Sequence, residues 1–88
     1  MRRLELEKPF RKRASKLLKK NPLLKETYES LLAKLSNNPF DPTLHTHPLT
    51  GELKGKYACS LTHDLRVVFR LYDDIVHLLD IGSHDEVY

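Results

Sequence analysis

The chain has 88 residues and a formal net charge of +3, with 15 lysines and arginines against 12 aspartates and glutamates. This length suffices for one small domain with one core but not for a second lobe, so any functional site must lie on a surface or in a shallow cleft. No apolar run approaches the roughly 20 residues that cross a membrane, and no signal peptide is recognisable. We therefore expect a soluble, cytoplasmic protein with no membrane partner.

Positive charge is concentrated in the first part of the chain. Residues 1–37 hold 11 basic and 4 acidic side chains, whereas residues 38–88 hold 4 and 8. One set of lysines recurs at every fourth position and shares a helix face: Lys8, Lys12, Lys16 and Lys20. Such a face predicts attraction to a polyanion, but it is equally typical of a solvated surface that keeps a protein soluble.

The first half of the chain has the pattern of a strand followed by two helices. Residues 3–7 alternate with period two, which predicts a short edge strand. Apolar residues then recur with helical spacing in two stripes, one from Phe10 to Leu18 and one from Leu24 to Leu35. Asn21 and Pro22 between the stripes are typical of an N-cap and a first helical position, so we predict a helical hairpin.

The second half of the chain has the pattern of a loop followed by strands. Residues 37–42 are predicted to end the second helix and to open a loop of about ten residues that contains His45 and His47, a length at which loops are often functional. Strands are predicted at residues 55–61, 65–72 and 75–81, with Asp73 and Asp74 as the turn between the last two. The lone Cys59 has no partner for a disulfide and is interpreted as a small strand residue.

These patterns predict one α+β domain over residues 1–88. An N-terminal edge strand and an α-helical hairpin pack on a small antiparallel β-sheet, because the apolar strands need a cover on at least one face.

The candidate chemistry lies at the turns and strand ends of the second half. Histidine exchanges protons near neutral pH, and RNA cleavage without a metal needs a base for the ribose 2′-hydroxyl, an acid for the leaving 5′-oxygen and positive charge for the phosphorane oxygens. The predicted catalytic residues are His47, Asp64, His84, His63 and Arg66. The predicted RNA-binding residues are Tyr88, Lys54, Lys56, Lys12, Lys16 and Lys20.

Each candidate also has a simpler explanation. His47 precedes Pro48 and could only stiffen the strand entry, Asp64 could cap a turn, and Arg66 could pair with a nearby acid. His84 is the hardest to explain structurally, because it follows the last apolar run in a segment that buries nothing obvious. His77 inside the last strand and His45 in the loop are left outside the site.

A metal site is disfavoured by the spacing of its possible ligands. His45 and His47, together with His63, Asp64, His84 and Asp85, could supply zinc ligands. Structural zinc sites favour compact cysteine-rich spacings, and no Cys-x-x-Cys or His-x-x-Glu-His pattern is present. We predict neither a metal nor a cofactor.

At these residues the chain resembles the RelE superfamily of bacterial type II toxins, and within it the YafQ-like mRNA interferases. The resemblance covers almost the whole length: the basic helical hairpin, residues 47–51 (His-Pro-Leu-Thr-Gly), Lys54-Gly55, Asp64 before an apolar strand, and Gly82-Ser83-His84 followed by Tyr88. It implies a RelE/ParE-like fold and a toxin that cleaves mRNA in the ribosomal A site, binds rRNA through its basic surface and is inhibited by a cognate antitoxin. Operator DNA would be bound only through the antitoxin complex.

The resemblance also carries roles to individual residues. His47, Asp64, His84 and Tyr88 match positions that YafQ-like proteins use for acid–base work and for holding the scissile nucleotide. Two departures are visible: a family histidine falls on Ser60, and Leu53 stands where relatives often have tryptophan. His63 could replace the missing histidine only if the chain turns near Thr62, because residues 60 and 63 of a straight strand point to opposite faces.

Two other functions remain open at this point. A ParE-like toxin of the same fold would poison DNA gyrase by binding alone, which requires neither the terminal histidine nor the aromatic residue. A non-catalytic member of the same fold would bind only its antitoxin and, with it, operator DNA. The sequence does not decide which histidine is the acid and which is the base.

Overall fold

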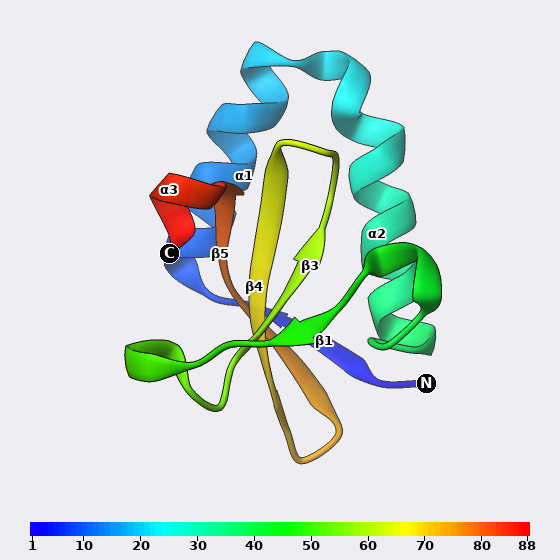
Figure 1. The fold of residues 1–88 in the computed structure, drawn as a ribbon. Helices are drawn as coiled ribbons and strands as arrows, with labels where there is room; N and C mark the ends of the chain where they lie inside the picture. The colour runs from blue at the N-terminus through cyan, green and yellow to red at the C-terminus, as the bar shows by residue number, and fades with distance from the viewer.

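The computed structural model describes residues 1–88 (Figure 1). In chain order the elements are β1 (Arg3–Leu6), α1 (Lys8–Lys20), α2 (Lys25–Asn37), β2 (His47–Pro48), β3 (Tyr57–Ser60), β4 (Leu65–Tyr72), β5 (Ile75–Ser83) and α3 (His84–Val87). Short 3₁₀ turns lie in three of the connections: Pro22–Leu24, Pro42–Leu44 and Gly51–Leu53.

The strands form one five-stranded sheet in the order β1-β5-β4-β3-β2. Neighbouring strands from β2 to β5 are antiparallel, whereas β1 joins the edge of the sheet parallel to β5. The predicted α+β fold with an N-terminal edge strand is confirmed. Two parallel strands cannot be joined by a tight turn and need a long crossover connection. The helical hairpin is part of the connection that leads from β1 to the other strands.

The helices α1 and α2 cover one face of the sheet. Their predicted apolar stripes supply Phe10, Ala14, Leu31 and Leu35 to a cluster of 12 buried residues that also contains strand side chains such as Cys59. Burial raises the pKa of the Cys59 thiol to about 12, so this side chain is an inert part of the core, as predicted. No helix of the structure has the length and apolar character needed to cross a membrane.

The turn between the two helices differs from the prediction. Asn21 ends α1, with its backbone N–H donating to the carbonyl of Leu17, and its side chain caps nothing. Pro22 does begin a helical segment, but that segment is a 3₁₀ turn, and α2 starts only at Lys25. The prediction that Asn21 caps the second helix was therefore wrong.

The last strand and the chain end also differ from the prediction. Strand β5 continues to Ser83, and a helix, α3, follows that the sequence pattern did not predict. A capping box starts this helix: the Glu86 backbone N–H donates to the Ser83 hydroxyl, and the Glu86 carboxylate accepts from the Ser83 backbone N–H. Val87 is buried, which corrects the expectation that this segment buries nothing.

Candidate functional site

Two of the predicted catalytic residues, His47 and Arg66, lie on the face of the sheet that α1 and α2 leave uncovered, which we call the open face. Cys59 and Val67 are paired across β3 and β4 and point into the helix-covered core. Side chains alternate along a strand, so the next pair, Ser60 and Arg66, points to the open face. His47 of β2 is paired with Ala58, two positions before Ser60, and lies on the same face.

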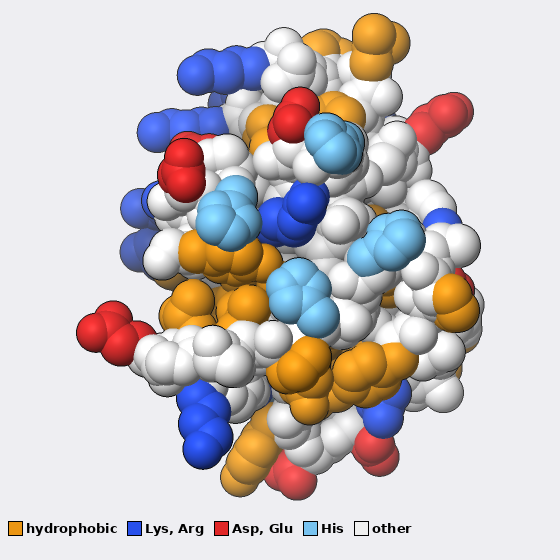
Figure 2. Space-filling view, in the orientation of Figure 1, with side chains coloured by type: hydrophobic (Ala, Val, Ile, Leu, Met, Phe, Trp, Pro, Cys, Tyr) orange, Lys and Arg blue, Asp and Glu red, His pale blue; other side chains and the backbone are white.

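A cleft of about 490 Å³ opens beside this part of the sheet, and we call it the histidine cleft. Its walls come from the loop before β2, the end of β3, the turn into β4 and the start of β4. The lining residues are Thr43, His45, His47, Ser60, Leu61, Thr62, His63 and Arg66. Figure 2 shows histidine side chains on this surface around a basic side chain.

The two ring nitrogens of His47 have different neighbours. Nδ1 lies 3.3 Å from the backbone carbonyl of His45, and Nε2 lies 3.5 Å from the hydroxyl of Tyr88. A carbonyl only accepts hydrogen bonds, so the tautomer with its proton on Nδ1 is the one in which Nδ1 donates to the carbonyl and Nε2 accepts from the phenol. Burial raises the pKa of Tyr88, with a smaller opposing effect of Arg66.

Helix α3 places His84 and Tyr88 together. Their rings meet edge to face with centroids 4.3 Å apart, and Nδ1 of His84 lies 3.6 Å from a carboxylate oxygen of Asp85. Arg13 of α1 secures this helix, because its Nη1 donates to the Glu86 carbonyl at 3.4 Å and pairs with Asp80 of β5 at the same distance. His84, Tyr88 and His47 thus form a continuous row of side chains from two distant parts of the sequence.

Arg66 holds the turn that joins β3 to β4. Its Nη1 donates to the backbone carbonyls of His63 at 2.8 Å, Thr62 at 3.0 Å and Leu65 at 3.3 Å. The expectation that Arg66 could pair with an acid is thus not met, since its partners are carbonyls. Its remaining N–H groups stay available to an anion that enters the histidine cleft.

The turn that His63 would need in order to replace the family histidine is present. Strand β3 ends at Ser60, and the backbone N–H groups of Leu61 and Thr62 both donate to the Leu65 carbonyl. His63 and Ser60 consequently line the same cleft. Asp64 is exposed next to His63, and its carboxylate forms no hydrogen bond or ion pair within the chain.

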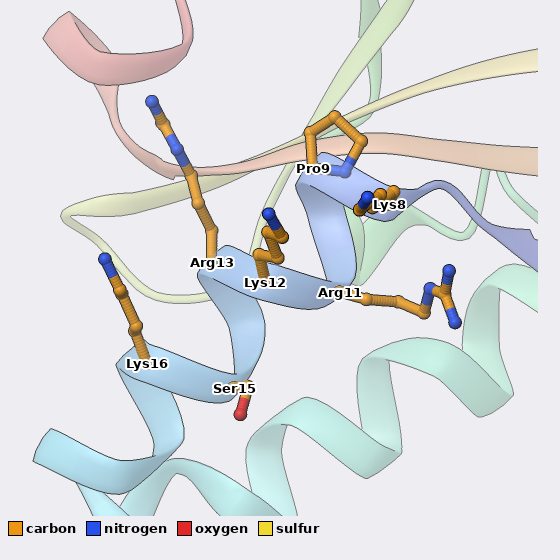
Figure 3. Close-up of a pocket in the computed structure, with 7 residues that line it drawn as sticks. All are labelled: Lys8, Pro9, Arg11, Lys12, Arg13, Ser15 and Lys16. Atoms are coloured by element: carbon orange, nitrogen blue, oxygen red, sulfur yellow. The ribbon is translucent and has the colours of Figure 1, made fainter.

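The predicted RNA-binding lysines lie in two separate places. Basic side chains of α1 surround a shallow hollow formed by Lys8, Pro9, Arg11, Lys12, Arg13, Ser15 and Lys16 (Figure 3). Lys16 and Lys20 also border a second hollow that reaches Leu65 and Glu86, beside α3. Lys54 and Lys56 lie in the connection between β2 and β3, where the Lys56 carbonyl accepts from the Leu49 N–H.

One histidine of the histidine cleft had been left outside the predicted site. His45 was interpreted as a surface histidine, yet it lines the cleft and also provides the carbonyl beside His47. Its position two residues before His47 was the sequence feature that could have assigned His45 to the site. His77 lies half-buried in β5 and lines a different hollow with Arg70 and Tyr72. No group of three or more histidine, cysteine, aspartate or glutamate side chains is arranged to hold a metal ion.

Known toxin structures share this fold. A copper-bound mutant toxin from Helicobacter pylori superposes with a TM-score of 0.87 at 31% identity and full coverage of both chains. YafQ in its complex with DinJ from E. coli gives 0.80 at 23% identity, covering 100% of this chain and 99% of that one. A YoeB/ParE toxin from Agrobacterium tumefaciens gives 0.81 at 16% identity, with 93% and 98% covered. The fold is therefore that of the RelE/YoeB-like toxins.

The family within this class follows from the sequence itself. Residues 2–88 match the family described as bacterial toxin of type II toxin-antitoxin system, YafQ. The chain belongs to the YafQ family of type II toxins, as the resemblance implied. A comparison with curated protein sequences gives no match.

Proposed function

We propose that this toxin is a ribosome-dependent endoribonuclease that cleaves mRNA in the A site and thereby inhibits translation. The observation that carries the proposal is the row His84–Tyr88–His47, which ends at the histidine cleft that His47 and Arg66 line. The row supplies two imidazoles and an aromatic ring, and the cleft supplies a guanidinium. Metal-independent RNA cleavage needs these groups.

His47 is the proposed general base. Its Nε2 lies 3.5 Å from the Tyr88 hydroxyl, and the ribose 2′-hydroxyl of an mRNA nucleotide would take the position that this hydroxyl holds. Nε2 would remove the 2′ proton while the 2′-oxygen attacks phosphorus. The bond from phosphorus to the 5′-oxygen then breaks, leaving a 2′,3′-cyclic phosphate.

His84 is the proposed general acid, since the departing 5′-oxygen needs a proton to become a hydroxyl. Its imidazole is exposed, and its Nδ1 lies 3.6 Å from a carboxylate oxygen of Asp85. Arg66 would neutralise the phosphorane oxygens with the N–H groups that the turn does not use. Asp64 and His63 are proposed to contact the substrate at the edge of the cleft.

The proposed partners follow from the family and from charge. A relative, YafQ, is known in a complex with DinJ, and we propose that a cognate antitoxin binds and inhibits this chain in turn. The basic side chains of α1 are proposed to contact rRNA, because phosphate contacts supply sequence-independent affinity. Operator DNA would be bound only through the antitoxin complex.

The test is to add the purified protein to translating ribosomes and to map the 5′ ends of the mRNA. We expect cuts within A-site codons that His47→Ala and His84→Ala reduce by about 10²-fold or more, the usual effect of losing one acid–base group. His77→Ala is the matched control, because it removes a histidine that does not line the histidine cleft.

Two results would overturn the proposal. Cuts that persist in both variants would show that the histidines do not carry the chemistry. An absence of ribosome-dependent cuts, with stabilised DNA breaks in a gyrase assay instead, would establish a ParE-like binding inhibitor.

A further inference from the structure

The loop before β2 contains a residue in an unfavourable backbone conformation. His45 has φ 53° and ψ 40°, the left-handed region that side chains with a Cβ rarely adopt. Such a residue persists only where its surroundings hold it, and such residues concentrate at functional sites. The surroundings of His45 must therefore hold its backbone in this conformation.

The cause is a network that fixes the loop on both sides of His45. The Asp41 carboxylate accepts from the Thr43 backbone N–H at 2.8 Å and from its hydroxyl at 2.6 Å, and Lys34 of α2 donates to the same hydroxyl at 2.9 Å. On the other side, the Thr46 hydroxyl donates to the carbonyl of the buried Pro39 at 2.6 Å. The loop thus reaches β2 along a defined path.

The consequence is the direction of one carbonyl group. His45 follows the 3₁₀ turn Pro42–Leu44 in the left-handed conformation, and its carbonyl lies 3.3 Å from Nδ1 of His47. Because the two residues are separated only by Thr46, a different backbone angle at His45 would move this carbonyl away from the imidazole.

We infer that His45 is a positioning residue whose left-handed backbone directs its carbonyl toward Nδ1 of His47. This contact holds the ring in the tautomer in which Nδ1 carries the proton and Nε2 carries none. The fixed tautomer is a property of the protein alone, and its value for cleavage rests on the proposed function. An imidazole held in the other tautomer would present a proton to the 2′-hydroxyl and could not act as its base. The His45 side chain itself is not required.

The experiment compares substitutions that differ in their tolerance of a positive φ. His45→Gly removes the imidazole but adopts this conformation without strain, whereas His45→Val is strongly disfavoured there and His45→Ala moderately so. Ring ¹⁵N NMR of the labelled full-length protein reports which nitrogen of His47 carries the proton, with the signals assigned by their loss in His47→Gln. The cleavage rate on programmed ribosomes is the second readout.

A matched control comes from the opposite end of β4. Asp73 also has a positive φ, of 50°, but it lies in the turn between β4 and β5. Asp73→Val therefore introduces similar strain without touching the loop before β2. It should lower the melting temperature and leave both the His47 tautomer and the rate unchanged.

We expect the unmodified protein and His45→Gly to carry the His47 proton on Nδ1 and to cleave at similar rates. His45→Val should shift the proton toward Nε2 and slow cleavage by about tenfold or more, with His45→Ala in between. A proton on Nε2 in the unmodified protein, an unchanged tautomer in both His45→Val and His45→Ala, or a slow His45→Gly with an unchanged tautomer would overturn the inference. If no variant cleaves RNA but the tautomers follow this order, the positioning role stands and the nuclease proposal fails.

Discussion

The hydroxyl of Tyr88 lies 3.5 Å from Nε2 of His47, although the two residues are 41 positions apart in the chain. Three features produce this contact: β2 pairs with β3, β5 runs beside β4 to Ser83, and α3 turns the chain end back over the open face. The contact gives Tyr88 two separable properties, a ring that can stack and a hydroxyl that occupies the acceptor nitrogen of His47.

Substitution of Tyr88 separates these two properties. Tyr88→Phe keeps the ring against His84 and frees Nε2 of His47, so ribosome-dependent cleavage should remain near that of the unmodified protein. Tyr88→Ala loses the aromatic ring, and since stacking on one base is worth about 1–3 kcal/mol, cleavage at limiting toxin should fall by roughly tenfold to a hundredfold. Equal losses in both variants would show that the hydroxyl, rather than the ring, contacts the RNA.

The basic side chains of α1 should contribute through charge alone. Lys16 is exposed between the two hollows beside this helix, so Lys16→Gln should weaken binding to ribosomes and reduce the slope of log affinity against log salt by about 1. Lys25→Gln, at the start of α2, removes the same charge from a position that lines neither hollow and is the matched control. A salt slope that changes equally in both variants would indicate a general effect of net charge.

The fold and the site differ in how far the sequence predicts them. Helical periodicity, strand alternation and the Asp73-Asp74 turn depend on local patterns, and they locate both long helices, this turn and every strand except β2. The two-residue β2 was predicted as part of a loop, and β3 is shorter than the strand predicted over residues 55–61. Helix α3 is a single turn, too short to produce a periodic pattern, and it depends on the capping box of Ser83 and Glu86 and on the burial of Val87 against the sheet. Short helices owe their stability to caps and tertiary contacts, which no apolar repeat reports.

The sequence suggests the candidate residues whose proposed role depends on a side chain, and it does not suggest those whose proposed role depends on the backbone. The roles proposed for His47 and His84 depend on their own side chains, so residue type and position suggested these roles before any contact was known. The carbonyl of His45 and the turn-holding bonds of Arg66 depend on the path of the chain. Every residue has a carbonyl, so no residue type in the sequence marks the one that faces His47.

Ser60 stands where the family has a histidine, and substitutions in the turn between β3 and β4 test which nearby residue takes its place. His63 lines the histidine cleft, whereas the adjacent Asp64 is exposed and has no partner within the chain. We expect Asp64→Asn to lower the cleavage rate by roughly tenfold with little change in stability, and His63→Gln to have a smaller effect. Their double variant should show whether the two act on one step, since independent losses multiply. A loss larger in His63→Gln than in Asp64→Asn would assign His63 the role of the missing histidine.

The cap of α3 should control activity more strongly than it controls stability. Ser83→Ala removes the hydroxyl that accepts from the Glu86 N–H, and loss of a serine cap typically costs about 1 kcal/mol. In a four-residue helix this loss frees the turn that carries His84 and Tyr88. The cleavage rate of Ser83→Ala should therefore fall strongly, whereas its melting temperature should change little. Ser15→Ala, at an exposed position within α1, is the control that removes a serine without removing a cap. Parallel losses of activity and stability in Ser83→Ala would mean that α3 only stabilises the fold.

The same cap predicts a dependence of stability on pH. The backbone N–H of Ser83, and after it the Ser83 side chain, hold the pKa of the Glu86 carboxyl below its ordinary value. A carboxyl whose pKa is lowered by folding stabilises the folded state above its unfolded pKa, and this contribution is lost as the pH falls through the folded pKa. Glu86→Gln should therefore flatten the decline in the free energy of unfolding between pH 6 and pH 3, measured by urea titration. The pKa of Asp41 is lowered in the same direction by its bonds to Thr43, so part of the decline should persist in Glu86→Gln and disappear only when Asp41→Asn is added. An unchanged pH profile in Glu86→Gln would show that the carboxylate does not hold α3 in solution.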